Sequence, residues 1–380
     1  MAKRRLGLLS LCGLSLSAMT ANAQGTYFIQ QKTPCPPIIV SPVQQPLAPT
    51  PATTTPPTTT QTTPQPTQST PTPEATPSTP DVDLGGGLAL GESTVALAMP
   101  GYIDNAIPMN RIRLRYDFAS NNPFPDRGEF FYPKCGCFTD PRAAGRFFDP
   151  NAKGPPLPES QVDYQEAELL VEKTIGCRAS VFIEAPWRWI NPEINTNENG
   201  FSDLRFGAKY AIIANSSTYL TAQIRVGVPT GDGRLGLGNE LTSYEPALLL
   251  TRQLGDRAFL HGEVRGWIPT NGSDFEADIM RYGLGLSYAV VDNCNFSVLP
   301  IGEVVAWQLL GGRKSNATEP APIDAAGDTI VNGKIGVRFG FGEKVAMGTH
   351  RSNLYVGYGH SFTGDRWYED MYRVEYQINY

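Results

Sequence analysis

The sequence predicts an all-β fold: an antiparallel up-and-down transmembrane β-barrel of about twelve strands, preceded by a disordered Thr/Pro-rich segment. Three observations predict this fold. Many segments of about the length that crosses a bilayer when tilted alternate apolar and polar residues. The connections between these segments are short and long in turn, and the last segment continues to the final residue. An up-and-down barrel has these properties, and its closure leaves no open sheet edge.

The N-terminus predicts an exported protein. Lys3-Arg4-Arg5 precedes an apolar run that ends near Met19, and Ala21-Asn22-Ala23 supplies small residues at a cleavage position. These features define a signal peptide over residues 1–23. The apolar run is too short to span a bilayer as a helix. A lipoprotein site at Cys12 is disfavoured because a bulky leucine precedes it.

Three segments separate the signal peptide from the barrel. Residues 24–47 form a short N-terminal segment without a clear period, and residues 48–80 are almost wholly Thr, Pro, Gln and Ser. Such a composition predicts a disordered linker that reaches on the order of 100 Å. It is either a spacer or a tether that binds the cell wall or a periplasmic partner. Residues 81–110 form a pre-barrel segment in which no strand is assigned. Its small-residue run from Gly85 to Leu97 is interpreted as a short strand or a plug, and Pro100-Gly101 and Pro108 break any regular element.

The barrel itself occupies residues 111–380. In residues 111–118 charged and apolar side chains alternate without a break. The predicted strands number about twelve, and single-chain bacterial barrels have even numbers. They lie near residues 111–118, 162–174, 178–189, 201–213, 218–228, 244–254, 258–268, 279–290, 296–307, 330–341, 353–362 and 370–380.

The last strand shows the pattern most clearly. In residues 372–380 the even positions are aromatic or aliphatic and the odd positions are charged or amides. Because successive side chains point to opposite faces, one face is apolar and the other polar. In a barrel the apolar face meets outer-membrane lipid and the polar face lines the interior. The terminal aromatic Tyr380 predicts recognition by the barrel-assembly machinery.

The connections support the same topology. Short connections alternate with long ones such as 119–161 and 308–329, as periplasmic turns alternate with outer loops in membrane barrels. A two-layer β-sandwich gives no reason for that order. Residues 342–352 are longer than expected for an inner turn. Aromatic residues near strand ends are interpreted as interfacial girdles; they are Trp187, Trp189, Trp267, Trp307, Trp367 and Tyr368.

Composition excludes other classes. The mean hydropathy is −0.25 and no later segment resembles a membrane-spanning helix. A net charge of −6 argues against electrostatic binding of nucleic acid. No cofactor and no metal site are predicted, since a Cys-x-Cys pair without a second pair is a weak metal signal. Disulfides, free thiols and metal ligation remain the alternatives for Cys135, Cys137, Cys177 and Cys294, and disulfides are favoured.

The predicted inner faces carry many charges. The lumen-lining candidates are Arg113, Arg115, Glu166, Glu168, Arg205, Lys209, Arg225, Glu263, Arg265, Arg338, Arg373 and Glu375. Arg113 and Arg115 on the first strand are expected to pair with Glu166 and Glu168 on the second. These charges either hold the wall together as ion pairs or select solutes along a polar pathway. Eight-stranded barrels are filled by side chains and sixteen-stranded barrels hold an aqueous channel, so the width of a twelve-stranded barrel does not decide between these two interpretations.

An enzyme is not predicted. The chain has three histidines, and only His261 shares a predicted inner face with other ionisable groups, Glu263 and Arg265. No motif places a nucleophile beside it. The glycine-rich stretch 231–238 lacks the strand–helix context of a phosphate loop and is interpreted as a flexible outer loop.

One family resemblance follows from three motifs. Residues 199–210 (NGFSDLRFGAKY) lead into a strand that ends at 227–232 (GVPTGD), and after a glycine-rich loop comes 244–248 (YEPAL). This order resembles the outer-membrane transporters grouped as the "MetA pathway of phenol degradation" family, over about residues 162–290. The resemblance implies a barrel that passes hydrophobic or aromatic compounds and brings no catalytic residues. The Thr/Pro tract and the cysteine-bearing first loop depart from the family.

The sequence therefore predicts an outer-membrane barrel for passive passage of small solutes, with its N-terminal tract in the periplasm. The alternative is a structural protein that tethers the envelope or a partner through its Thr/Pro-rich segment. Expected partners are outer-membrane lipid, the barrel-assembly machinery, and the cell wall or a periplasmic protein that contacts residues 24–80.

Overall fold

The computed structural model describes residues 99–127, 132–345 and 349–380. The expected signal peptide, residues 24–47, the Thr/Pro-rich linker and the first part of the pre-barrel segment lie outside the described residues. In the described part of the chain, no helix is long and apolar enough to cross a membrane.

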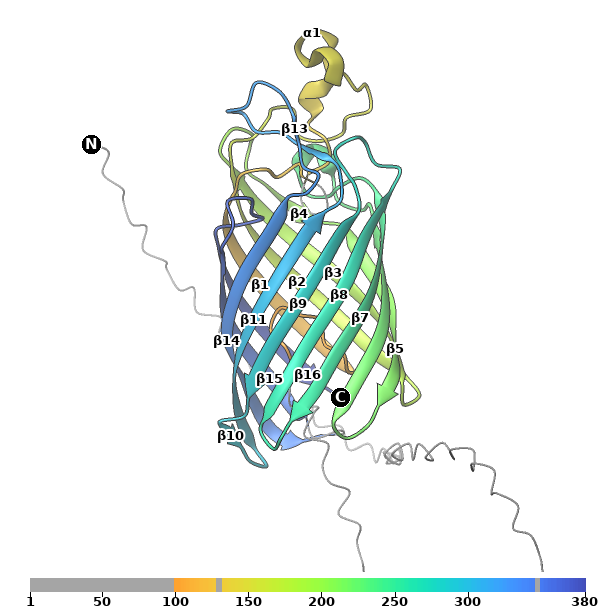
Figure 1. Cartoon of the computed structure of the whole chain (residues 1–380), viewed down its shortest axis with the longest axis vertical. Coiled ribbons are helices and arrows are strands. Elements are labelled where there is room, and N and C mark those ends of the chain that lie inside the picture. The colour runs from red at the N-terminus through yellow and green to blue at the C-terminus, as the bar shows by residue number, and fades with distance from the viewer. Residues whose placement is uncertain (1–98, 128–131, 346–348) are drawn as a thin grey trace, which may run out of the picture. The chain divides into compact units, whose positions relative to one another are not determined.

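Twelve long strands form a closed antiparallel barrel, which confirms the predicted fold class (Figure 1). Each strand pairs with its neighbours in sequence, and the ring closes where the first strand pairs with the last. The wall strands are β1 (Arg111–Asn122), β2 (Val162–Ile175), β3 (Ala179–Pro192), β5 (Leu204–Ala214), β6 (Thr218–Val228), β7 (Thr242–Leu254), β8 (Ala258–Thr270), β9 (Ile279–Tyr288), β11 (Phe296–Leu309), β14 (Thr329–Lys344), β15 (His350–Ser361) and β16 (Asp370–Asn379).

The strands match a bilayer in length. The 12 residues of β1 extend about 40 Å at roughly 3.3 Å per residue, which is about 28 Å along the normal at a tilt of about 45°. The predicted strand positions agree with the observed ones to within a few residues. The largest difference is at β1, which continues to Asn122. β14 continues to Lys344 and β15 begins at His350, so the inner turn between them is shorter than expected.

The two faces of the wall differ as the alternation predicts. From Tyr372 to Asn379 in β16 the charged and amide residues are buried, whereas the aromatic and aliphatic residues between them are exposed. The same holds around the ring. The exposed apolar side chains of the wall include Ile112, Leu114, Leu169, Ile183, Phe206, Tyr210, Ile224, Leu248, Val264, Leu284, Leu286, Val304, Ile335, Val356, Val374 and Ile378. An apolar outside and a charged inside are the reverse of a soluble sheet and fit a lipid-facing wall.

The girdle interpretation is wrong for four of the six aromatic residues. Trp189 is exposed on the outer surface. By contrast Trp267, Trp307, Trp367 and Tyr368 are each at most 5 % exposed and belong to the buried hydrophobic cluster. Trp267 and Trp307 lie at inward positions of β8 and β11, because they share the parity of the buried Glu263 and Glu303 on those strands.

Long loops collect at one end of the barrel and short turns at the other (Figure 1). The first long loop contains η2 (Gly136–Thr139), α1 (Pro141–Ala144) and η3 (Gly145–Phe147). The other small elements are β4 (Glu198–Phe201), η4 (Gly233–Leu235), β10 (Val291–Asp292), β12 (Arg313–Lys314) and β13 (Ile323–Asp324).

Residues 99–110, called the lumenal segment below, lie inside the barrel (Figure 1). Both ends are near the short turns. Gln377 Nε2 lies 3.2 Å from Met99 Sδ, and Asn110 accepts a hydrogen bond of 2.9 Å from the Thr174 N–H, next to the turn after β2. The middle of the segment reaches Arg225, three residues from the long-loop end of β6. The interpretation as a short strand or a plug concerned residues 85–97, which lie outside the described residues, so it stays a prediction.

Candidate functional site

Three consecutive backbone N–H groups of the lumenal segment bind one wall carboxylate. Gly101, Tyr102 and Ile103 donate to Glu303 over 3.2, 2.8 and 3.1 Å. Glu303 is 4 % exposed. A concave run of N–H groups stabilises an anion, so this contact satisfies both the segment's donors and the carboxylate.

Asp104 is the only charged residue of the lumenal segment. Its carboxylate contacts Arg225 at 2.7 Å and Gln223 at 3.0 Å, and it also pairs with Arg265. Its N–H donates to Glu263 over 2.9 Å. One acidic side chain thus joins the middle of the segment to β6 and β8.

Cationic side chains of the wall also bind backbone carbonyls of the lumenal segment. Arg338 donates to Pro100 over 2.7 Å, Arg373 to Gly101 over 3.0 Å, and Lys209 to Asn105 over 3.1 Å. Arg281 likewise donates to Tyr102 over 2.9 Å. The segment has no strand partners within the described residues, so polar contacts with charged wall groups replace a ladder.

The pairs expected between the first two strands are present. Arg113 lies 2.8 Å from Glu168, and Arg115 lies 2.9 Å from Glu168 and 3.2 Å from Glu166. Arg205 on β5 also contacts Glu168, at 2.7 Å. Each carboxylate serves several guanidinium groups, which is the arrangement that makes buried charges tolerable.

The remaining lumen-lining candidates lie in the same interior. Lys209 contacts Glu172 at 3.3 Å, a buried carboxylate on β2. The other contacts are Glu263 with Arg265 at 2.9 Å, Arg338 with Glu375 at 2.9 Å, and Arg373 with Asp117 at 2.7 Å.

Several interior residues were missing from the candidate list. Glu184, Arg188 and Glu245 are buried and ion-paired. Their alternation with exposed neighbours on β3 and β7 was a signal that could have found them. Asp104 had no such signal, because the lumenal segment has no period.

A cavity of about 150 Å³ lies between the lumenal segment and the outer loops. Tyr102 and Asp104 of the segment line it on one side, and Asn239 and Leu241 of a long loop line it on another. Arginines, carboxylates and the buried tryptophans of the wall complete the lining. Charged groups and flat apolar surfaces therefore meet in one space.

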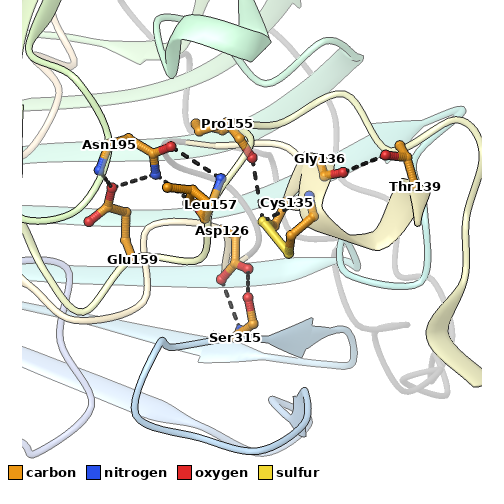
Figure 2. The surroundings of a disulfide bond; sticks show 10 residues. Asp126, Cys135, Gly136, Thr139, Pro155, Leu157, Glu159, Asn195 and Ser315 are labelled. Atoms are coloured by element: carbon orange, nitrogen blue, oxygen red, sulfur yellow. Dashed lines mark hydrogen bonds between the residues drawn. A yellow bond between two sulfur atoms is a disulfide. The ribbon is translucent and has the colours of Figure 1, made fainter. Parts of the chain in front are cut away.

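The outer loops are held by contacts of their own (Figure 2). Cys135 and Cys137 form a disulfide, and Asp126 accepts hydrogen bonds from both the N–H and the hydroxyl of Ser315. Burial raises the pKa of Asp126 to about 7. The first loop is thereby joined to the loop after β11.

The other cysteines differ from each other. Cys177 also belongs to a disulfide, whereas Cys294 is exposed and has a free thiol. A disulfide at Cys294 is therefore not present. The structure groups no three metal-ligating side chains among the residues it describes.

His261 lies within hydrogen-bond distance of two hydroxyl side chains. Its Nδ1 lies 3.3 Å from Thr251 Oγ1 and its Nε2 lies 3.0 Å from Ser287 Oγ. The residue is fully buried in the wall of β8. It is a hydrogen-bonded interior side chain between β7 and β9.

No family model and no curated protein matches the chain, so the resemblance to the phenol-degradation family is not confirmed. Solved barrels do match. The KdgM porin is 10 % identical, with 71 % of this chain and 99 % of that chain covered and a TM-score of 0.37. The NanC porin is 11 % identical, with 71 % of this chain and 100 % of that chain covered and a TM-score of 0.38. The β-domain of the Bordetella autotransporter BrkA is 14 % identical, with 71 % of this chain and 100 % of that chain covered and a TM-score of 0.42. The likeness is one of fold.

Proposed function

We propose that the chain is an outer-membrane barrel for passive passage of small solutes, including hydrophobic or aromatic compounds, and that the lumenal segment closes the passage. One observation carries this proposal. The segment occupies part of the lumen, yet every strand pairing of the wall is made without it. It can therefore leave the lumen while the barrel stays intact, which a side-chain-filled barrel cannot do.

The polar wall supports a solute pathway once the segment is displaced. Groups that bind the segment, such as Glu303, Arg281 and Arg338, would then face water. Arg113, Arg115, Glu166 and Glu168 would lie beside the pathway and influence which charged solutes enter.

The apolar outer face supports placement in the outer membrane, where a closed barrel satisfies all backbone hydrogen bonds internally. Both ends of the lumenal segment lie at the short-turn end, which supports a periplasmic position for the chain that precedes residue 99. Assembly through β16 by the barrel-assembly machinery is part of the same proposal.

Conductance of the purified full chain in planar bilayers tests passage directly. We expect discrete openings, and the same unit conductance from a variant lacking residues 48–80. A folded barrel that neither conducts nor admits small solutes into liposomes would refute passage.

A structural role is the second candidate, and the dense interior ion pairing favours it, since such pairs brace a wall without passing anything. An anchoring protein would lose its role when residues 48–80 are deleted and keep it when the lumen is blocked. Detachment of the envelope in the deletion strain, together with absent conductance, would establish this candidate.

A further inference from the structure

Lys334 makes no salt bridge with the carboxylate that lies opposite it in the barrel wall. It lies on β14 directly across from Glu303 on β11. Glu303 is instead occupied by the N–H groups of Gly101, Tyr102 and Ile103. Within the described part of the chain, no carboxylate lies at salt-bridge distance from Lys334 and no acceptor binds its ammonium group. The lumenal segment thus binds the Glu303 carboxylate and places no carboxylate of its own beside Lys334.

Lys334 is nevertheless only 5 % exposed. Its ammonium group lies 3.7 Å from the ring centroid of Tyr102, and 5.5 Å from those of Trp307 and Tyr368. Aromatic faces attract a cation but carry no net charge. A buried ammonium group with rings and no anion is an incomplete ion pair.

Further cations surround it. Arg281 stacks on the same Trp307 ring, 5.5 Å from its centroid, and Arg373 stacks on Tyr102 at 4.0 Å. Arg281 and Arg373 have carboxylate partners in Glu263 and Asp117, whereas Lys334 has none. Of these three cations, Lys334 is the one without a carboxylate at salt-bridge distance, so an anion in the cavity would find an unoccupied ammonium group there.

Lys334, Trp307 and Tyr368 all line the 150 Å³ cavity, as do Trp267 and Trp367. A dry apolar cavity of about that volume accommodates a benzene ring. The present cavity is lined by charged groups as well, so it matches that case in volume, and aromatic rings lie next to the Lys334 ammonium group on its wall.

We propose that this cavity binds a small organic anion, with its carboxylate on Lys334 and a flat apolar ring against Trp307 and Tyr368. This inference deepens the proposed function by naming a solute class for the passage, and it rests on that function. The anion makes the direct contact that Glu303 does not make to Lys334, and the rings distinguish it from an inorganic ion.

Titration of the purified full chain in detergent tests the site, with tryptophan fluorescence and calorimetry as readouts. The probes are benzoate, its neutral analogue benzamide, acetate and chloride. We expect benzoate to bind at least tenfold more tightly than the other three. Lys334→Met should lose at least tenfold in benzoate affinity, Lys334→Arg should retain binding, and Lys153→Met, at an exposed loop lysine, should match the wild type.

Equal affinity for benzoate and benzamide would overturn the charge assignment, and equal affinity for benzoate and acetate or chloride would overturn the ring assignment. These comparisons use the wild-type chain, so they decide the proposal even if Lys334→Met does not fold. Heat-modifiable migration on gels reports folding of each variant. If the barrel binds benzoate but does not conduct, the proposed passage of solutes is refuted and the binding site stands. If it conducts but binds all four probes equally, the binding site is refuted and the proposed passage stands.

Discussion

Asp104 shows how one residue can position a whole segment. It carries the segment's single charge, and it reaches Arg225 and Arg265 on two different strands. Both arginines also contact Glu245, so they stay paired with the wall when the segment leaves. The segment's hold on this part of the wall therefore depends mainly on its own carboxylate.

Asp104→Asn should loosen the lumenal segment. Removing one partner of a buried ion pair costs on the order of 3 kcal/mol, which would raise the ratio of open to closed barrels about a hundredfold. Open probability in planar bilayers is the measurement. Asp256→Asn, at an exposed carboxylate in a short turn, is the matched control and should leave the openings unchanged. Indistinguishable gating of Asp104→Asn and the wild type would contradict this role.

Asp126 predicts a pH dependence of the outer loops. Burial raises its pKa to about 7 in the fold, above about 3.9 in an unfolded chain. The folded loops thus bind the proton more tightly, and their stability falls as pH rises from about 4 to about 7. Relative to Asp126→Asn at the same pH, we expect equal proteolysis within residues 123–161 at pH 5 and faster wild-type cleavage at pH 8. If the ratio of wild-type to Asp126→Asn cleavage rates is the same at pH 5 and pH 8, the raised pKa of Asp126 is contradicted.

At the scale of elements, the strands could be predicted because one physical rule governs each of them. A wall strand separates lipid from a polar interior, so its side chains alternate over most of its length, as in residues 111–118 of β1 and 372–379 of β16. The lumenal segment obeys no such rule. Its contacts are long-range hydrogen bonds to Glu303, Arg281 and Arg338, which leave no period in the sequence.

The aromatic residues show a different limit. Position near a strand end suggested a membrane girdle, but parity decides the face, and Trp267 and Trp307 share the inward parity of Glu263 and Glu303. The alternation of polar and apolar residues in those strands would therefore have predicted that both tryptophans face the interior. Trp367 lies in the connection between β15 and β16, where no strand alternation applies, so its burial could not be predicted from the pattern.

The terminal strand yields a prediction about assembly. Tyr380 is exposed on the outer side beyond β16. If the assembly machinery reads this aromatic group, Tyr380→Asp should reduce the folded barrel in the membrane several-fold, measured by heat-modifiable migration. Tyr244→Asp places the same charge at another exposed tyrosine on the wall and is the control. Equal losses in both variants would point to the cost of a charge facing lipid instead.

At the scale of the whole molecule, the barrel has three parts with separate roles. A wall with an apolar outside fits a membrane, loops joined by contacts such as Asp126 with Ser315 cover one end, and the lumenal segment occupies the interior from the other. The wall contributes the structure, and the segment contributes the control of passage that we propose.

Immobilising the lumenal segment tests this account most directly. A Cβ atom at Gly283 of β9 would lie 2.8 Å from Ile103 Cγ1, so Ile103→Cys with Gly283→Cys brings two thiols within disulfide reach. We predict that the oxidised double variant does not conduct, that reductant restores openings, and that each single variant and the wild type conduct with and without reductant. Unchanged conductance of the oxidised, cross-linked barrel would contradict the claim that passage requires the segment to move.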